Sequence, residues 1–422
     1  MRRSRLVQAA RATVRAAILL FAVPALAGAQ AALPPEPATR DEALRQLRQA
    51  KARRSASYTP GRLEKWVTKI ENDRLLEDWL TAGEGGRYYV KFGGLVSGAG
   101  LAAGPGFRLR RLAGGHIDVN AWAVFSYRKY VHAEASVRAP RLAGGRLHLG
   151  GYVGRKYYPQ EDFFGIGPAS NRGDRVSFMY RDRAVGGVAE AILAPPLLAR
   201  ATVEYLTPEI GSGKDSRYPS IEERFTDETA PGLATQPSFL MTRGELELDY
   251  ASPPGNPRRG GRYFASAARY TDRDTGHYSY DRFDVDLRQY LPFLQERRVI
   301  VLRAVTRWTR AGSGGEVPFY AQPTLGGSRT LRGFRDYRFR DLGQILLQAE
   351  YRWEILPALD AALFYDTGKV APRFADLRLK HLERDYGFGF RIGTNRGVFL
   401  RVDAAFGSSG GPHYFIKLSH VF

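Results

Sequence analysis

The sequence predicts an all-β protein, a 16-stranded antiparallel transmembrane β-barrel with a short N-terminal helical segment. Apolar and polar residues alternate strictly from about residue 87 to the C-terminus, which is the pattern of strands with one apolar and one polar face. The 422 residues include 23 Tyr, 23 Phe and 46 Gly, a composition that suits strands and turns better than helices. Beyond residue 29, no apolar run reaches the roughly 18–20 residues of a membrane-spanning helix, which excludes a helical membrane protein.

Residues 1–29 have the pattern of a secretory signal peptide. Arginines are frequent over residues 1–15, residues 16–27 are apolar, and small residues then allow cleavage after Ala27 or Ala29. An exported chain is expected, so the nucleic-acid binding that a formal charge of +20 would otherwise suggest is excluded. The absence of cysteine excludes disulfide frameworks, thiolate metal sites and cysteine nucleophiles.

Residues 30–85 are predicted to form a periplasmic helical segment. Its clearest part is 58–80, where Trp66, Ile70 and Trp79 belong to an apolar stripe and basic residues flank it. Glycines at 83, 85 and 86 end the helical pattern. The stripe is compatible with the inner leaflet of the outer membrane or with the periplasmic mouth of the barrel, and the short link to the first strand favours the mouth.

Residues 86–422 are predicted to form the barrel. A soluble antiparallel sandwich gives the same alternation, but three observations favour a barrel in lipid. Some strands are long for a sandwich, as over 175–193, and their polar faces carry opposed charges that suit a water-filled lumen. Aromatic residues gather near strand ends, where an interfacial girdle lies in such barrels. Export without a helical anchor makes the outer membrane of a Gram-negative bacterium the expected location.

Sixteen strands can be counted from the alternation and the turns. They lie near 87–96, 105–112, 116–127, 130–139, 146–157, 174–194, 199–209, 239–251, 259–272, 278–292, 298–310, 342–354, 359–370, 385–394, 397–406 and 412–422. The long connections 158–173, 211–238 and 311–341 all follow odd-numbered strands, so they are expected on one side of the membrane. An even number of strands places both ends of the barrel on the periplasmic side.

The last strand has the pattern of a C-terminal barrel-assembly signal. The residues of this predicted signal share one face of the strand: Tyr414, Ile416, Leu418, His420 and the terminal Phe422. Barrels of the outer membrane usually end on an aromatic residue with aromatic or apolar residues at every second position before it. His420 departs from that pattern.

Three short motifs carry a resemblance to a known family. They are Leu331-Arg332-Gly333-Phe334 in the long connection after the eleventh strand, Glu350-Tyr351-Arg352 in the twelfth, and Phe364-Tyr365-Asp366-Thr367-Gly368 in the thirteenth. Together with eleven strands before the connection and five after it, they resemble the BamA/TamA-like superfamily of outer-membrane proteins, which includes the bacterial surface antigen family. The resemblance implies that the connection folds back into the barrel and that Arg332 pairs with Asp366.

The strand alternation points to the same partners. Asp366 and Gly368 share the inward face of the thirteenth strand, and Glu350 and Arg352 share that of the twelfth. A loop that carries Arg332 can therefore reach both acids, while Gly333 allows a tight tip and Phe334 supplies an apolar anchor, and the four residues 331–334 are expected to act as a loop-tip brace. The alternative is that these are ordinary charges of a wet lumen that meet by chance.

Assembly factors of the superfamily carry periplasmic POTRA domains that receive client chains. The residues before the barrel hold only the helical segment, so the chain is expected to be a family member without POTRA domains. Client capture by such domains, and with it an insertase activity, does not follow from the resemblance alone.

Two functions remain open. The first is assembly or translocation of outer-membrane proteins or lipids through a loop-braced barrel, and the alternative is a passive, anion-preferring pore. Neither needs a cofactor or a metal, and no catalytic constellation predicts an enzyme. Expected partners are outer-membrane lipids and lipopolysaccharide, the barrel assembly machinery that inserts the chain itself, and a client polypeptide or lipid, but no nucleic acid.

Overall fold

The computed structural model describes residues 87–93, 95–96, 98–253, 255–356, 359–394, 397–407 and 411–417. These all belong to one compact unit, Gly61–Phe422. The predicted signal peptide at 1–29, the predicted helical segment at 30–85, and Leu418, His420 and Phe422 of the C-terminal signal lie outside the described residues.

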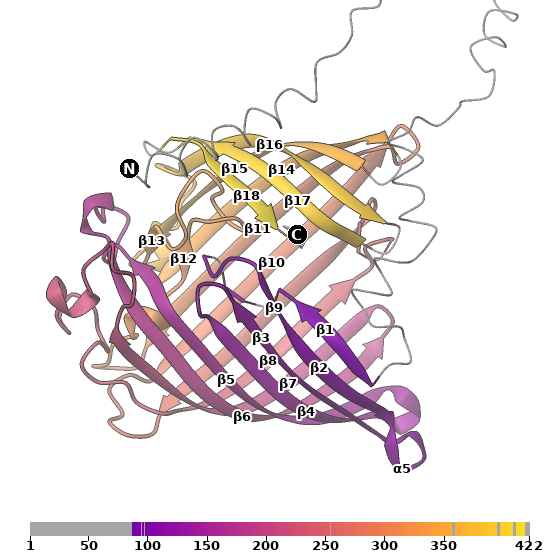
Figure 1. The fold of residues 1–422 in the computed structure, drawn as a ribbon, viewed down its shortest axis with the longest axis horizontal. Coiled ribbons are helices and arrows are strands. Elements are labelled where there is room, and N and C mark those ends of the chain that lie inside the picture. Colours follow the sequence, from indigo (N-terminus) through magenta and orange to yellow (C-terminus); the bar gives the residue numbers. More distant parts are fainter. Residues whose placement is uncertain are drawn as a thin grey trace, which may run out of the picture. The chain divides into compact units, whose positions relative to one another are not determined.

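Sixteen strands form a single antiparallel sheet in which each strand pairs with the next one along the chain (Figure 1). The strands are β1 Tyr88–Phe92, β2 Ala102–Arg111, β3 Ile117–Ser126, β4 Val131–Leu142, β5 Leu147–Phe163, β6 Val176–Ala194, β7 Leu197–Ser212, β8 Phe239–Asp249, β9 Gly260–Asp272, β10 Tyr280–Phe293, β11 Arg298–Ala311, β14 Gly343–Leu356, β15 Leu359–Ala371, β16 Glu383–Thr394, β17 Gly397–Phe406 and β18 His413–Lys417. The predicted count and the antiparallel topology are confirmed.

The first and last strands are the two ends of this sheet. Within 88–92 and 413–417, the described parts of β1 and β18, no ladder joins the two strands. We call the line along which β1 and β18 end the sheet the seam. β1 has only 5 residues, fewer than predicted, because the chain after it turns inward and packs Ala99, with Leu95 and Val96, against Tyr130 and Tyr158.

The connections differ most from the prediction. β5 and β7 continue to Phe163 and Ser212, past the predicted ends at 157 and 209, and shorten two of the long connections. The third long connection holds a hairpin that the sequence pattern does not reveal, made of β12 Thr324–Leu325 and β13 Phe339–Arg340. The described residues also include short helical turns, among them α5 Leu112–Gly115 between β2 and β3.

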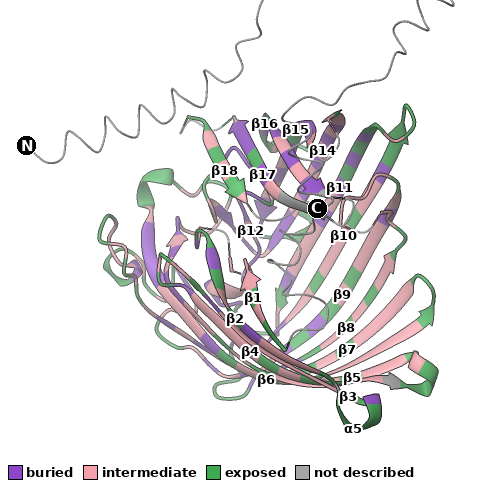
Figure 2. Ribbon diagram, turned by 45° about the vertical axis from the view of Figure 1, so that its right-hand side comes forward, coloured by how far each residue is buried: buried purple, intermediate pink, exposed green. Residues whose placement is uncertain are grey.

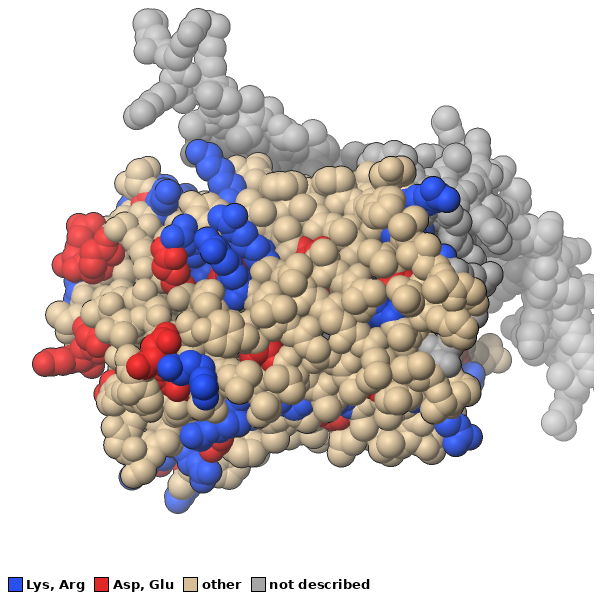
Figure 3. Space-filling view, turned by 90° about the horizontal axis from the view of Figure 1, so that it is seen from below, with Lys and Arg blue, Asp and Glu red and all other residues tan. Residues whose placement is uncertain are grey.

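The outer surface of the sheet is apolar. On β15 the outward Leu363 is 50% exposed and Tyr365 is 43% exposed, whereas the inward Phe364 and Asp366 between and beside them are buried. This alternation of exposed and buried residues recurs along the strands (Figure 2). Figure 3 shows one face of the molecule with a broad area that has few charged residues, while most Lys, Arg, Asp and Glu of this face lie toward the left. So much exposed apolar surface is expected where strands face lipid.

No helix among the described residues is long and apolar enough to cross a membrane.

The inner face of β14 to β17 is charged and buried. Glycines on this face of β16 make room for large neighbours, because a Cβ at Gly387 would lie 2.4 Å from the ring of Phe364. A Cβ at Gly389 would lie 2.7 Å from the Arg391 guanidinium. The fold therefore brings a buried polar wall to the side of the barrel next to the seam.

Candidate functional site

The long connection between β11 and β14 folds back against the inner wall. An apolar cluster seats it, in which Leu331 and Phe334 of the tip and Leu325 of β12 pack with Leu346 of β14 and Val370 of β15. Leu325, Leu331 and Leu346 are fully buried. Burial of a leucine side chain contributes about 1.5–3 kcal/mol, so the cluster provides much of the energy that holds the loop inside.

Arg332 lies at the centre of the loop contact with the wall. Its Nε donates to Asp366 Oδ2 at 2.6 Å and its Nη2 donates to Asp366 Oδ1 at 2.7 Å, which is a bidentate pair. Its Nη1 donates to Glu350 Oε2 at 2.9 Å, and the guanidinium lies 3.5 Å from the centre of the Phe364 ring. The side chains of Arg332, Asp366 and Glu350 are all 0% exposed.

A wider ion network supports this pair. Glu350 accepts from Arg352 Nε at 2.7 Å and from Arg391 Nη2 at 2.9 Å. Arg391 in turn donates to Asp403 at 2.5 Å, and Arg401 lies 3.0 Å from the same carboxylate. The network joins Arg332, Arg352, Arg391 and Arg401 to Glu350, Asp366 and Asp403, and all seven residues are buried.

Two further residues hold the backbone of the loop. Gln348 Nε2 donates to Thr330 O at 2.8 Å and to Asp366 Oδ1 at 3.0 Å. Arg303 of β11 donates to Arg329 O at 3.2 Å and to Gln348 Oε1 at 3.0 Å. The loop is thus fastened by side chains from β11, β14 and β15 together.

Gly333 is needed for close approach. A Cβ at this position would lie 2.5 Å from Asp385 Cβ and 3.1 Å from Phe406 O, so any larger residue would push the tip away from β16 and β17. Gly368 is similarly crowded, since a Cβ there would lie 3.3 Å from Leu325 of the loop.

The motif residues therefore meet in space, but other residues that surround them do not belong to any motif. Arg391, Arg401, Asp403 and Gln348 belong to the network but not to the motifs. The alternation of β16, with Arg391 on the same face as three glycines, was a usable signal for an inward charge. Of the predicted C-terminal signal, Tyr414 and Ile416 face outward and are 72% and 65% exposed.

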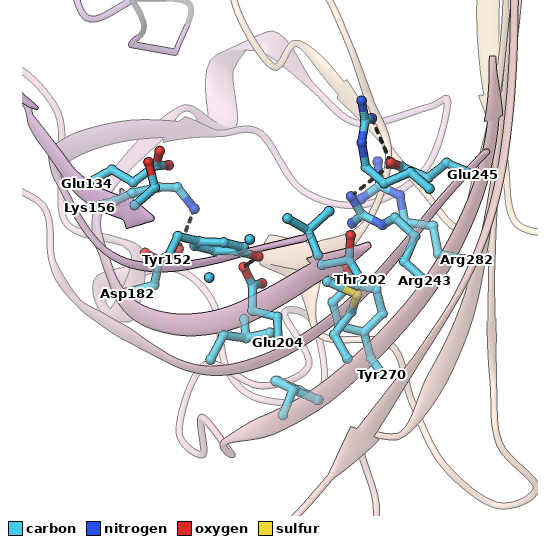
Figure 4. A pocket seen from close by; sticks show the side chains of 18 of the residues that line it. Glu134, Tyr152, Lys156, Asp182, Thr202, Glu204, Arg243, Glu245, Tyr270 and Arg282 are labelled. Carbon is cyan, nitrogen blue, oxygen red and sulfur yellow. Dashed lines mark hydrogen bonds and ion pairs between the residues drawn. The ribbon is translucent and has the colours of Figure 1, made fainter. Parts of the chain in front are cut away.

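The lumen also contains a chamber of about 510 Å³ (Figure 4). Its wall carries both signs of charge: Lys156 donates to Asp182 at 2.9 Å on one side, and Arg243 donates to Tyr270 at 2.9 Å on the other. Among the residues that the structure describes, no group of three or more His, Cys, Asp or Glu is placed to hold a metal ion.

The chain is thus an antiparallel barrel with an apolar exterior and a long loop held inside by buried charges. Residues 244–409 match the Omp85 superfamily domain, and this match supports a BamA/TamA-like barrel of that superfamily. The outer membrane of Gram-negative bacteria is accordingly its location.

Solved structures with the same fold are distant in sequence. BamA from Haemophilus ducreyi lacking POTRA domains 1–3 has a TM-score of 0.59 at 12% identity, over 83% of this chain and 76% of that one. CdiB from Escherichia coli has a TM-score of 0.52 at 13% identity, over 76% of this chain and 59% of that one. No curated protein sequence matches the chain.

Proposed function

We propose that this barrel assembles or translocates outer-membrane polypeptides or lipids, and that the loop 324–340 is an internal brace for that work. The observation that carries the proposal is the fully buried contact of Arg332 with Asp366 and Glu350. This contact fastens the loop to β14 and β15, a few strands before the seam. The seam is where the barrel wall would have to open for a client to enter the bilayer.

The seam is the mechanically weak part of the wall. β10 and β11 share 14 register pairs, whereas β1 shares 5 with β2. A backbone hydrogen bond contributes about 1 kcal/mol net, so the short ladder of β1 costs little to rearrange. The braced wall of β14 to β17 keeps its shape while an edge moves.

Partners follow from the same proposal. Outer-membrane lipids and lipopolysaccharide would surround the apolar exterior, the barrel assembly machinery would insert the chain, and a polypeptide or lipid would be the client. The helical segment predicted at 30–85 would then lie in the periplasm. No step calls for a cofactor or for enzymatic chemistry.

Reconstitution tests the proposal. The full mature chain is placed in liposomes, and the insertion of an unfolded outer-membrane client is followed by its heat-modifiable migration. Faster insertion than in empty liposomes is expected, and a slower rate is expected for Arg332→Ala. Insertion no faster than in empty liposomes would end the claim for polypeptide clients.

The alternative, a passive pore, draws support from the chamber of about 510 Å³. Its lining includes Arg138, Lys156, Arg200, Arg243 and Arg282 against Glu134, Asp182, Glu204 and Glu245, which favours anions weakly. Planar-bilayer recordings decide: steady conductance with anion preference supports the pore, and a closed barrel contradicts it.

A further inference from the structure

The seam holds a cavity of about 380 Å³ that lies apart from the Arg332 contact. Residues from both ends of the sheet line it, including Phe92 of β1 and Ile416 and Lys417 of β18, and the loop contributes Ser328 and Arg329. In Figure 1, β18 and β1 are the yellow and indigo ends of the sheet, with the loop beside them.

The inner side of this cavity is cationic. Arg329, Arg401 and Lys417 line it, and no acid does so among the described residues. Arg401 and Lys417 are directly opposite in the β17–β18 ladder, a placement in which like charges destabilise a sheet. The acids that bear on these charges lie outside the lining: Asp403 is 3.0 Å from Arg401, and the charge of Asp336 acts on Lys417.

Arg401 also has a buried hydrogen-bond donor without an acceptor. Its side chain is 1% exposed, and its Nη2 donates to Ser328 O at 2.7 Å. Its Nη1 is buried and has no hydrogen-bond partner. A buried donor without an acceptor costs about 1–3 kcal/mol, so an anion that accepts from Arg401 Nη1 would be stabilised at this wall of the cavity.

The outer side of the same cavity is apolar and faces lipid. Leu101, Tyr127 and Ile416 line it and are 59%, 77% and 65% exposed. Ile416 and Lys417 are consecutive in β18, so their side chains point to opposite faces of the wall. The cavity therefore reaches from the lumen to the lipid side through the seam.

We infer that this cavity binds an anionic membrane lipid. The phosphate of the headgroup lies among Arg329, Arg401 and Lys417, where it satisfies Arg401 Nη1 and separates the like charges, and the acyl chains leave past Leu101 and Ile416 into the bilayer. A polypeptide strand added at the seam would be held by backbone hydrogen bonds, which need no cations. The inference deepens the proposed function, on which it rests for the role of the seam, by making a lipid the client class.

Lipid retention tests the site without any assay of client insertion. The purified full chain is equilibrated with mixed micelles of phosphatidylglycerol and phosphatidylcholine, and the lipids retained are counted by native mass spectrometry. One phosphatidylglycerol per barrel is expected, with phosphatidylcholine excluded. Lys417→Gln and Arg329→Gln should each weaken retention about tenfold, because each removes one charged partner of the phosphate, while Lys417→Arg should preserve it.

Arg310→Gln is the matched control, since it removes an arginine that is 68% exposed and lies outside the cavity lining. Heat-modifiable migration shows that each variant is folded. Equal retention of the two lipids, or retention that is insensitive to Lys417→Gln and Arg329→Gln, overturns the inference. So does Lys417-dependent binding of a peptide with an aromatic C-terminal carboxylate when no lipid is retained. Failure of client insertion leaves these readouts unaffected, so the two proposals fail separately.

Discussion

Solvent does not reach the Arg332 side chain, so it does not screen the interaction of its charge with Asp366. The charged inner faces of the strands suit a water-filled lumen, but at the loop the apolar cluster and the loop itself cover the pair, whose side chains are 0% exposed. Removing one member of a buried ion pair costs about 3–5 kcal/mol. Asp366 would keep the hydrogen bond from Gln348 Nε2 at 3.0 Å but lose its charged partner.

Arg332→Ala is therefore expected to release the loop while the barrel stays folded. Protease cleavage within 320–340 should rise, and heat-modifiable migration should persist because the strand ladders are unchanged. Asp366→Ala should behave alike, and the double variant should be little worse than either single one. Arg310→Ala, at an exposed pair with Asp281, serves as the control. Additive defects would mean that the two residues act separately.

Asp341 gives the loop a dependence on pH. It is buried between β13 and β14, its Oδ1 accepts the Leu342 N–H at 2.8 Å, and its Oδ2 has no hydrogen-bond partner. Burial raises its pKa to about 6, against about 3.9 in an unfolded chain. The protonated form is thus favoured in the folded loop, and stability falls as pH rises from about 4 through 6.

Hydrogen exchange over 324–342, corrected for the intrinsic rate, should show stronger protection at pH 5 than at pH 8. Asp341→Asn should reduce the difference in protection between the two values, since the amide cannot ionise. Asp376→Asn is the control, because Asp376 is on the surface and pairs with Arg373. If Asp341→Asn leaves the difference between pH 5 and pH 8 unchanged, another group causes it.

The elements divide into those that local pattern determines and those that it does not. The alternation of apolar and polar residues was sufficient to predict the sixteen strands, because their outward faces contact lipid and their inward faces contact the lumen. The hairpin of β12 and β13 has only 2 residues in each strand, and its place depends on contacts with residues more than fifteen positions away. The motif resemblance located Arg332 and Asp366, but it carried no information about Arg401 or Asp403.

The apolar stripe of the helical segment predicted at 58–80 leads to a test at the scale of an element. This segment lies outside the described residues, so the prediction rests on the sequence. If it packs against the periplasmic mouth, deletion of residues 58–82 should raise single-channel conductance. Deletion of residues 32–50, which lack the stripe, is the control. Unchanged conductance after the first deletion would favour the membrane surface.

In the whole molecule, the stabilised wall of β14 to β17 lies beside the less stable seam between β1 and β18. Long ladders and the buried ion network stabilise β14 to β17. At the seam beside them, β1 shares 5 register pairs with β2, and a lipid-facing cavity is lined by cations and, among the described residues, by no acid. Assembly or translocation through such a barrel requires the seam to open while the braced wall holds.

Locking the seam tests this claim most directly. The chain has no cysteine, so a pair introduced with one residue in Tyr88–Phe92 and one in His413–Lys417 can form a disulfide without competitors. The control pair replaces Ala265 and Val285, which face each other in the β9–β10 ladder away from the seam. We expect the oxidised seam variant to insert clients no faster than empty liposomes do. Reductant should restore the rate, and the control pair should have no effect. A locked barrel that inserts clients at the unlocked rate would contradict it.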